Sequence, residues 1–169
     1  MSEQSQPAFD PAFWFKWIMA TTVGWLLGSL LLPSLSTVAA GVGAGVMQCL
    51  VLYRRLPQVW RWALATALAW IGGWVLLLTL VPSDLRFLLT GLIVGLCTGL
   101  AQWSLLRREV RWAGWWIAIG ALAWITGLTL LPGILSTGAL AGATSGLALS
   151  LLLHNPKHAG HPAPAGEQP

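Results

Sequence analysis

Six apolar stretches follow one another along the chain, separated by short turns and connections. They are Phe13–Leu32, Leu35–Tyr53, Trp62–Val81, Phe87–Leu106, Trp112–Leu131 and Ile134–Leu153. Each stretch has about 19–20 residues, enough for a helix to cross roughly 30 Å of hydrocarbon at ~1.5 Å per residue. The stretches show no alternating strand pattern, and open sheets cannot span lipid. The sequence therefore predicts an all-α integral membrane protein with six transmembrane helices.

These stretches form three similar hairpins. In the first stretch of each hairpin a Trp precedes the turn proline by eight residues: Trp25 and Pro33, Trp74 and Pro82, Trp124 and Pro132. The second stretch has small residues at every fourth position: Thr37-Gly41-Gly45, Gly91-Gly95-Gly99 and Gly138-Gly142-Gly146. On a helix this spacing forms a smooth face that a neighbouring backbone can approach closely. We expect three parallel helical-hairpin repeats (13–56, 57–108 and 109–153) related by pseudo-threefold symmetry.

The segments outside the hairpins, residues 1–12 and 154–169, have no hydrophobic periodicity. They are rich in Pro, Ser, Gln, His and Ala, which predicts disordered tails flanking a membrane domain of residues 13–153. The three histidines, His154, His158 and His161, all fall here. A solvated tail is the preferred interpretation over a metal site, so no metal is expected.

Composition supports the membrane class and gives an orientation. The chain is 56% hydrophobic and 8% charged, whereas a soluble domain has about a quarter charged residues. All basic residues except Arg86 lie on one side of the predicted membrane domain. The connections between hairpins carry Arg54, Arg55, Arg61, Arg107, Arg108 and Arg111, while Lys16 precedes the core of the first stretch and Lys157 follows the last. The positive-inside rule then places both termini in the cytoplasm. This basic excess is an orientation signal, and no nucleic-acid partner is expected.

Twelve tryptophans are unevenly distributed over the chain. Seven lie near the basic ends of the stretches and predict an aromatic belt at the membrane surface: Trp14, Trp17, Trp60, Trp62, Trp112, Trp115 and Trp116. Trp25, Trp74 and Trp124 lie deeper, where an indole is either a packing wedge or a stacking platform. One and two turns before them, large residues in one hairpin align with small ones in another, which predicts interlocking side chains.

Two glutamines and four arginines are the candidate contact residues. Gln48 and Gln102 follow the small-residue faces, and Leu149 replaces them in the third hairpin. A buried amide needs a partner, so each Gln either bonds a neighbouring helix or contacts a ligand. The Arg pairs Arg54-Arg55 and Arg107-Arg108 are topology determinants or contacts for anionic lipid head groups.

The chain lacks the patterns that catalysis or ion coupling would require. No ionisable residue lies deep within a stretch, and no nucleophile–base pair is evident. Cys49 and Cys97 suit small packing positions, and the sequence calls for no cofactor. We therefore expect a protein that is not an enzyme.

The run Gly95-Leu-Cys-Thr-Gly99-Leu-Ala-Gln102-Trp103-Ser-Leu-Leu-Arg107-Arg108, followed by Ala113-Gly-Trp115-Trp116, carries a resemblance. It is similar to the G-xxx-G-xx-Q-W-xxx-L-R-R repeats of uncharacterised Trp-rich multi-pass membrane proteins of cyanobacteria and related bacteria. Cys49, where Trp would follow Gln48, and Leu149 depart from that pattern. The resemblance implies a bacterial cytoplasmic or thylakoid-type membrane.

Two functions remain open from the sequence. The first is a non-enzymatic scaffold, assembly or accessory subunit, which would bind a partner membrane protein or further copies of itself. The alternative is a transport or small-molecule-binding subunit with an aromatic pocket between the repeats, formed by Trp25, Trp74, Trp124 and the glutamines.

Overall fold

The computed structural model describes residues 9–31 and 35–156, and the regular elements in these ranges are helices. They are α1 (Pro11–Leu31), α2 (Ser36–Leu52), α3 (Trp60–Leu80), α4 (Arg86–Glu109), α5 (Trp115–Ile125), its π-helical continuation η2 (Thr126–Leu130) and α6 (Ile134–Leu153). The predicted stretches match these elements to within a few residues. The turn proline Pro33 and most of the two tails lie outside the described residues.

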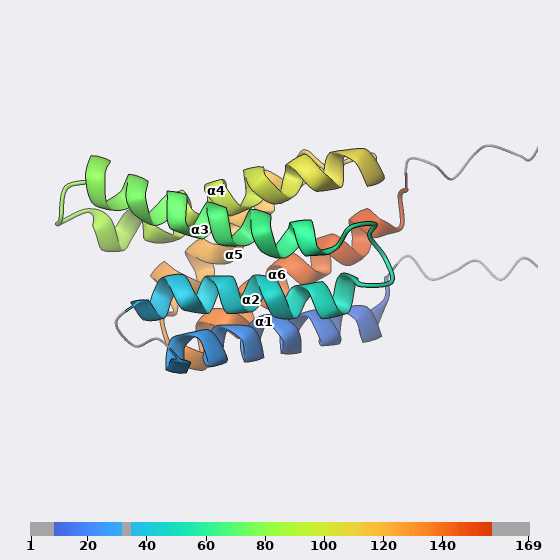
Figure 1. The fold of residues 1–169 in the computed structure, drawn as a ribbon, viewed down its shortest axis with the longest axis horizontal. Helices are drawn as coiled ribbons and strands as arrows, with labels where there is room; N and C mark the ends of the chain where they lie inside the picture. Colours follow the sequence, from blue (N-terminus) through green and yellow to red (C-terminus); the bar gives the residue numbers. More distant parts are fainter. Residues whose placement is uncertain (1–8, 32–34, 157–169) are drawn as a thin grey trace, which may run out of the picture.

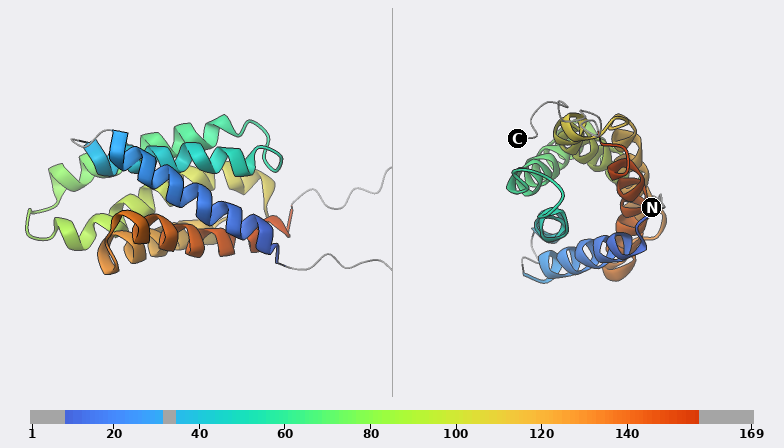
Figure 2. Two further views of the ribbon diagram at one scale, coloured as in Figure 1. Left: turned by 90° about the horizontal axis from the view of Figure 1, so that it is seen from below. Right: turned by 90° about the vertical axis from the view of Figure 1, so that its right-hand side faces the viewer.

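The helices form a closed ring. Each helix packs against its neighbours in the sequence, and α6 packs against α1 to close the circle. All six run lengthwise between the same two ends (Figure 1), and the view along this direction shows them arranged around a common centre (Figure 2). The described chain ends lie together, because the backbone N–H of Asp10 donates to Ser150 Oγ near the end of α6 at 3.1 Å.

The predicted small-residue faces form the joins between successive hairpins. In α4, a Cβ added to Gly95 would lie 2.7 Å from Ala121 Cα of α5. In α6, a Cβ added to Gly142 would lie 3.0 Å from Ile18 Cα of α1. In α2 the face receives side chains of α3, with the Trp70 indole against Gly41. Each even-numbered helix thus uses its glycines to pack against the first helix of the next hairpin.

The two ends of the ring differ in their charged side chains. The basic end carries the α2–α3 and α4–α5 connections and their arginines. At the opposite end, Arg86 donates to the carbonyls of Val81 at 3.1 Å and Leu78 at 2.9 Å. These are terminal acceptors of α3 without a helical partner, so Arg86 is engaged in capping that helix.

Among the described residues, three helices are long and apolar enough to cross a membrane: α3, α4 and α6. The apolar segments Ser36–Leu52 and Trp115–Leu130 are shorter. Large hydrophobic side chains cover the outside of the ring, among them Leu68 and Leu88. This combination of length and apolar exposure identifies a membrane protein.

The tight join at Gly95 leads to a first prediction. Gly95→Ala places a methyl group against the backbone of α5 and should destabilise the fold by about 1–3 kcal/mol through overpacking. Gly72→Ala is the matched control, because an added Cβ there meets nothing within 4 Å. It should be neutral or stabilise by up to about 1 kcal/mol, since glycine is unfavourable within a helix. Circular dichroism during thermal unfolding in detergent measures the stability of both variants. Equal changes in Tm would contradict a tight α4–α5 join at Gly95.

Candidate functional site

Side chains from the odd-numbered helices form three layers in the interior of the ring. The layer nearest the basic end contains three buried indoles, those of Trp17, Trp62 and Trp116. One helical turn further lie Thr21, Thr66 and Gly120. A second indole layer follows, formed by Trp25, Trp70 and Trp124. Indoles therefore meet indoles at two levels, and the level between them holds the small residues.

This arrangement corrects the register predicted for the middle hairpin. Trp70, rather than Trp74, meets the other two deep indoles, with ring centroids 5.7 Å from Trp25 and 4.8 Å from Trp124. The predicted alternation of large and small residues is consequently wrong. Helix α3 continues ten residues beyond Trp70, whereas the first helix of each other hairpin ends six residues beyond its Trp. The prediction aligned the deep tryptophans by their distance from the turn proline, and for Pro82 this alignment is wrong by one helical turn. The α3–α4 tip extends past the other tips in Figure 1.

The predicted aromatic belt also requires correction. Trp60, Trp112 and Trp115 are exposed at the basic end, as a belt requires. Trp17, Trp62 and Trp116 instead point inward and are 0–1% exposed. The exposed and the buried tryptophans lie at similar distances from the basic end in the sequence. They differ in the face of the helix that they occupy.

Gln48 and Gln102 bond neighbouring helices. The Gln48 amide nitrogen donates to Thr21 Oγ1 at 3.0 Å, while its oxygen accepts the Trp62 indole N–H at 3.0 Å. Gln48 on α2 thereby joins α1 to α3. Because an indole nitrogen is a donor and never an acceptor, it fixes which end of the amide faces it.

Gln102 repeats this geometry one hairpin later. Its nitrogen donates to Thr66 Oγ1 at 2.8 Å and its oxygen accepts from Trp116 Nε1 at 2.9 Å. The two amides thus make equivalent bonds, one between the first and second hairpins and one between the second and third.

The third join uses a residue that sequence reasoning missed. Leu149 and Gly120 occupy the places of the Gln and Thr, and Trp17 Nε1 donates to Ser145 Oγ at 3.0 Å. Ser145 precedes the last glycine of the α6 face, where α4 has Thr98 and α2 has Ala44. The sequence signal that could have identified Ser145 is its hydroxyl, which can accept a hydrogen bond in the hairpin that lacks the Gln.

Little space remains between the indole layers. A cavity of about 20 Å³ lies among residues that include Gln48, Gln102 and Ser145. That volume suffices for one water molecule. Within the described residues the buried indole nitrogens of Trp70 and Trp74 have no hydrogen-bond partner.

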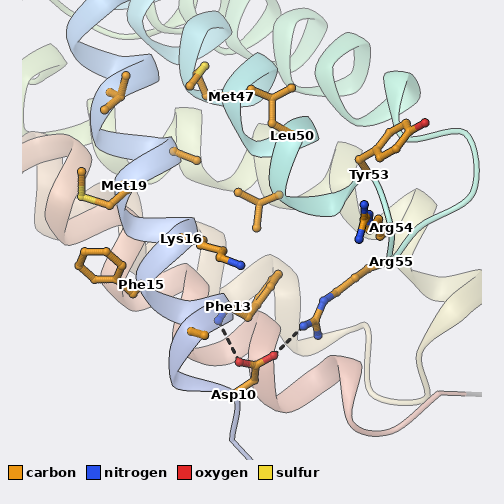
Figure 3. A pocket seen from close by; sticks show the side chains of 14 residues that line it. Asp10, Phe13, Phe15, Lys16, Met19, Met47, Leu50, Tyr53, Arg54 and Arg55 are labelled. Atoms are coloured by element: carbon orange, nitrogen blue, oxygen red, sulfur yellow. Dashed lines mark hydrogen bonds and ion pairs between the residues drawn. The ribbon is translucent and has the colours of Figure 1, made fainter.

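The four candidate arginines lie at the basic end in different surroundings. Arg55 forms an ion pair with Asp10 at 2.6 Å and lies over the Phe13 ring at 4.5 Å. Arg107 lies 5.1 Å from the centre of the Trp103 ring. Arg108 borders a cleft beside the α2–α3 connection. Arg54 lines a groove between α1 and α2 (Figure 3).

Asp10 connects this end of the ring to helix α1. Its carboxylate accepts the Phe13 backbone N–H at 2.9 Å, the bond of an N-cap residue. This bond and the Arg55 guanidinium hold the pKa of Asp10 below its usual range. The carboxylate thus caps α1 and ties it to the end of α2.

No family model, curated protein or solved structure matches the chain. In residues 9–31 and 35–156, no three His, Cys, Asp or Glu side chains gather as a possible metal site. His154 Nδ1 lies 2.7 Å from the Ser150 carbonyl, and His158 and His161 fall outside the described residues.

The glutamine bonds lead to a second prediction. Gln48→Leu leaves the Trp62 indole without an acceptor and should cost about 1–3 kcal/mol of stability. Adding Ala44→Ser supplies the hydroxyl found at the third join and should recover part of that loss. Gln102→Leu should cost less, because Thr98 already has a hydroxyl at the corresponding place. Thermal unfolding in detergent compares the four proteins, and a double variant no more stable than Gln48→Leu would refute the equivalence of Gln48 and Ser145.

Asp10 gives a third prediction. Asp10→Ala should destabilise the protein by about 1 kcal/mol through loss of the cap, whereas Asp10→Asn retains a capping side chain and should cost less. Because the folded-state pKa of Asp10 is lowered, its charge stabilises the fold above the unfolded pKa. That contribution disappears as the pH falls through the folded pKa. Unfolding measured from neutral to acid pH should show this loss in the wild type, and the same loss in Asp10→Asn would exclude Asp10 as its source.

Proposed function

We propose that all six helices cross the membrane, with the basic end and both termini in the cytoplasm. The parallel course of the helices between two common ends supports this topology (Figure 1). Even α2, with 17 residues, has a length of about 26 Å at ~1.5 Å per residue. The described basic residues other than Arg86 gather at one end, as the positive-inside rule requires of the cytoplasmic side.

The three hairpins are, in this proposal, parallel repeats around a pseudo-threefold axis. The equivalent bonds of Gln48 and Gln102 support it, as do the two layers of three indoles. The resemblance to Trp-rich multi-pass proteins belongs to the same proposal and suggests a bacterial cytoplasmic or thylakoid-type membrane.

We infer that the protein is a non-enzymatic scaffold, assembly or accessory subunit of a membrane complex. The observation behind this inference is the way the core uses its polar groups. Gln48, Gln102 and Ser145 bond the indoles that surround them, so these groups serve the fold. The outer surface then presents the side chains available to partners, which are apolar residues and exposed indoles.

The axis gives no support to the alternative of a transport or small-molecule-binding subunit. An aromatic pocket between the repeats would need several hundred Å³ to hold a metabolite. The cavity between the indole layers has about 20 Å³, and Trp70 fills the place predicted for Trp74.

Native mass spectrometry after extraction into membrane-derived polymer discs provides a fourth prediction. The protein should appear in a complex of fixed stoichiometry with a second membrane protein or with further copies of itself. Bulky substitutions test one outer face at a time: Leu68→Trp on α3, Leu88→Trp on α4 and Leu135→Trp on α6, all exposed positions. At least one should dissociate the complex without lowering thermal stability. A monomer carrying lipid and nothing else, unaffected by all three, would contradict the scaffold function.

A further inference from the structure

Helices α1 and α2 cross closely and leave a groove on their outer side. At the crossing, a Cβ added to Gly24 would lie 2.7 Å from Ala44 Cα, and Gly28 meets the Ala39 backbone. Towards the basic end lies a hollow of about 800 Å³, and towards the opposite end one of about 430 Å³. Met47 lines both, so the two hollows meet at the crossing.

Cations gather at one end of this groove. Lys16 from α1 and Arg54 beyond α2 line it, beside the Asp10–Arg55 ion pair (Figure 3). Since Arg55 offsets the charge of Asp10, the groove keeps the positive charges of Lys16 and Arg54. In the described part of the chain neither side chain has an ion-pair or hydrogen-bond partner.

The rest of the groove is apolar, and its first hollow covers about two thirds of the depth of one membrane leaflet. Met19 and Val23 line its α1 side, with Met47 and Leu50 on its α2 side. Half of a roughly 30 Å hydrocarbon core is about 15 Å, or about ten residues of helix. The first hollow reaches Val23 on α1, seven residues or about 10 Å from Lys16, and the second hollow continues the groove from Gly24 onward. Flexible methionine side chains can adapt to an irregular chain.

We propose that an anionic phospholipid occupies the α1–α2 groove. Its phosphate lies between Lys16 and Arg54, and one acyl chain runs along Met19, Val23 and Met47. The exposed Tyr53 lies beside the head group, where amphipathic rings are favoured. This inference rests on the proposed membrane topology, which puts the cations at the cytoplasmic leaflet with its anionic lipids.

Charge complementarity favours a lipid over a partner helix as the occupant. An apolar helix in the groove would cover Lys16 and Arg54 without neutralising them, and a desolvated unpaired cation is costly. A phospholipid supplies an anion at one end and hydrocarbon over the rest, in the order in which the groove presents its side chains.

The test uses the full chain reconstituted in phosphatidylcholine nanodiscs with a small fraction of phosphatidylglycerol carrying a photoreactive acyl chain. After irradiation, mass spectrometry should locate the adducts on the α1 and α2 peptides that contain Met19 and Met47. The double variant Lys16→Gln/Arg54→Gln should lower the yield about thirtyfold at low lipid fraction, given about 1 kcal/mol per cation. Arg61→Gln/Arg111→Gln removes the same charge from the same end and should stay within about twofold of the wild type.

A groove-filling variant separates the acyl chain from charge. Met47→Trp keeps both cations but narrows the groove, so it should also lower the yield, and thermal unfolding verifies that each variant is folded. Adducts spread evenly over exposed leucines, equal labelling by a phosphatidylcholine probe, or a cross-link from the groove to another polypeptide in place of lipid would overturn the proposal. A folded protein that failed to enter nanodiscs would instead contradict the membrane topology.

Discussion

The fold depends on a hydrogen-bond acceptor for each of three buried indole N–H groups. Trp17, Trp62 and Trp116 are almost fully enclosed, and an indole nitrogen can donate but not accept. A donor left unpaired there would cost about 1–3 kcal/mol, a large fraction of a typical folding free energy. Each N–H finds its acceptor on the hairpin that precedes it around the ring, on Gln48, Gln102 or Ser145. The three bonds therefore set how the hairpins are rotated and how high each lies relative to the next.

Glycines make these bonds possible by letting the helices come close. At the α4–α5 and α6–α1 joins the faces of Gly95 and Gly142 meet backbone, and at the α2–α3 join Gly41 accommodates the Trp70 ring. Dispersion forces between closely packed helices replace the hydrophobic effect, which gives no attraction between helices in lipid. The same device within the first hairpin, at Gly24 and Gly28, produces the groove outside it, because two helices that touch at small residues diverge on either side.

Much of this architecture could be predicted from periodicity. The apolar stretches, the spacing of small residues and the placement of arginines each follow from helix geometry and membrane physics, and the helices lie within a few residues of the predicted spans. The bonding of Gln48 and Gln102 to neighbouring helices was one of two predicted interpretations. The register of α3 could not be predicted from the sequence. One extra helical turn at the α3–α4 tip leaves the hydrophobic period unchanged, but it moves Pro82, the residue used to align this hairpin with the other two.

The remaining errors have a similar physical origin. Trp60 and Trp62 are two residues apart and have the same preference for an interface, yet one faces outward and the other faces the core. Local sequence does not determine that choice, which depends on Gln48 lying within reach of Trp62. Likewise Ser145 gains its role from the loss of Gln at Leu149, and Lys16 and Arg54 meet because of how α1 and α2 cross.

The most direct test of this account is hydrogen exchange of the indole N–H groups, followed by NMR on ¹⁵N-tryptophan-labelled protein in detergent or nanodiscs. Assignment by single Trp→Phe variants identifies each signal. We expect slow exchange for Trp17, Trp62 and Trp116, whose N–H groups are buried and bonded, and fast exchange for the exposed Trp60, Trp112 and Trp115. Exchange of Trp62 and Trp116 as rapid as that of Trp60 would contradict the claim that these bonds hold the ring together.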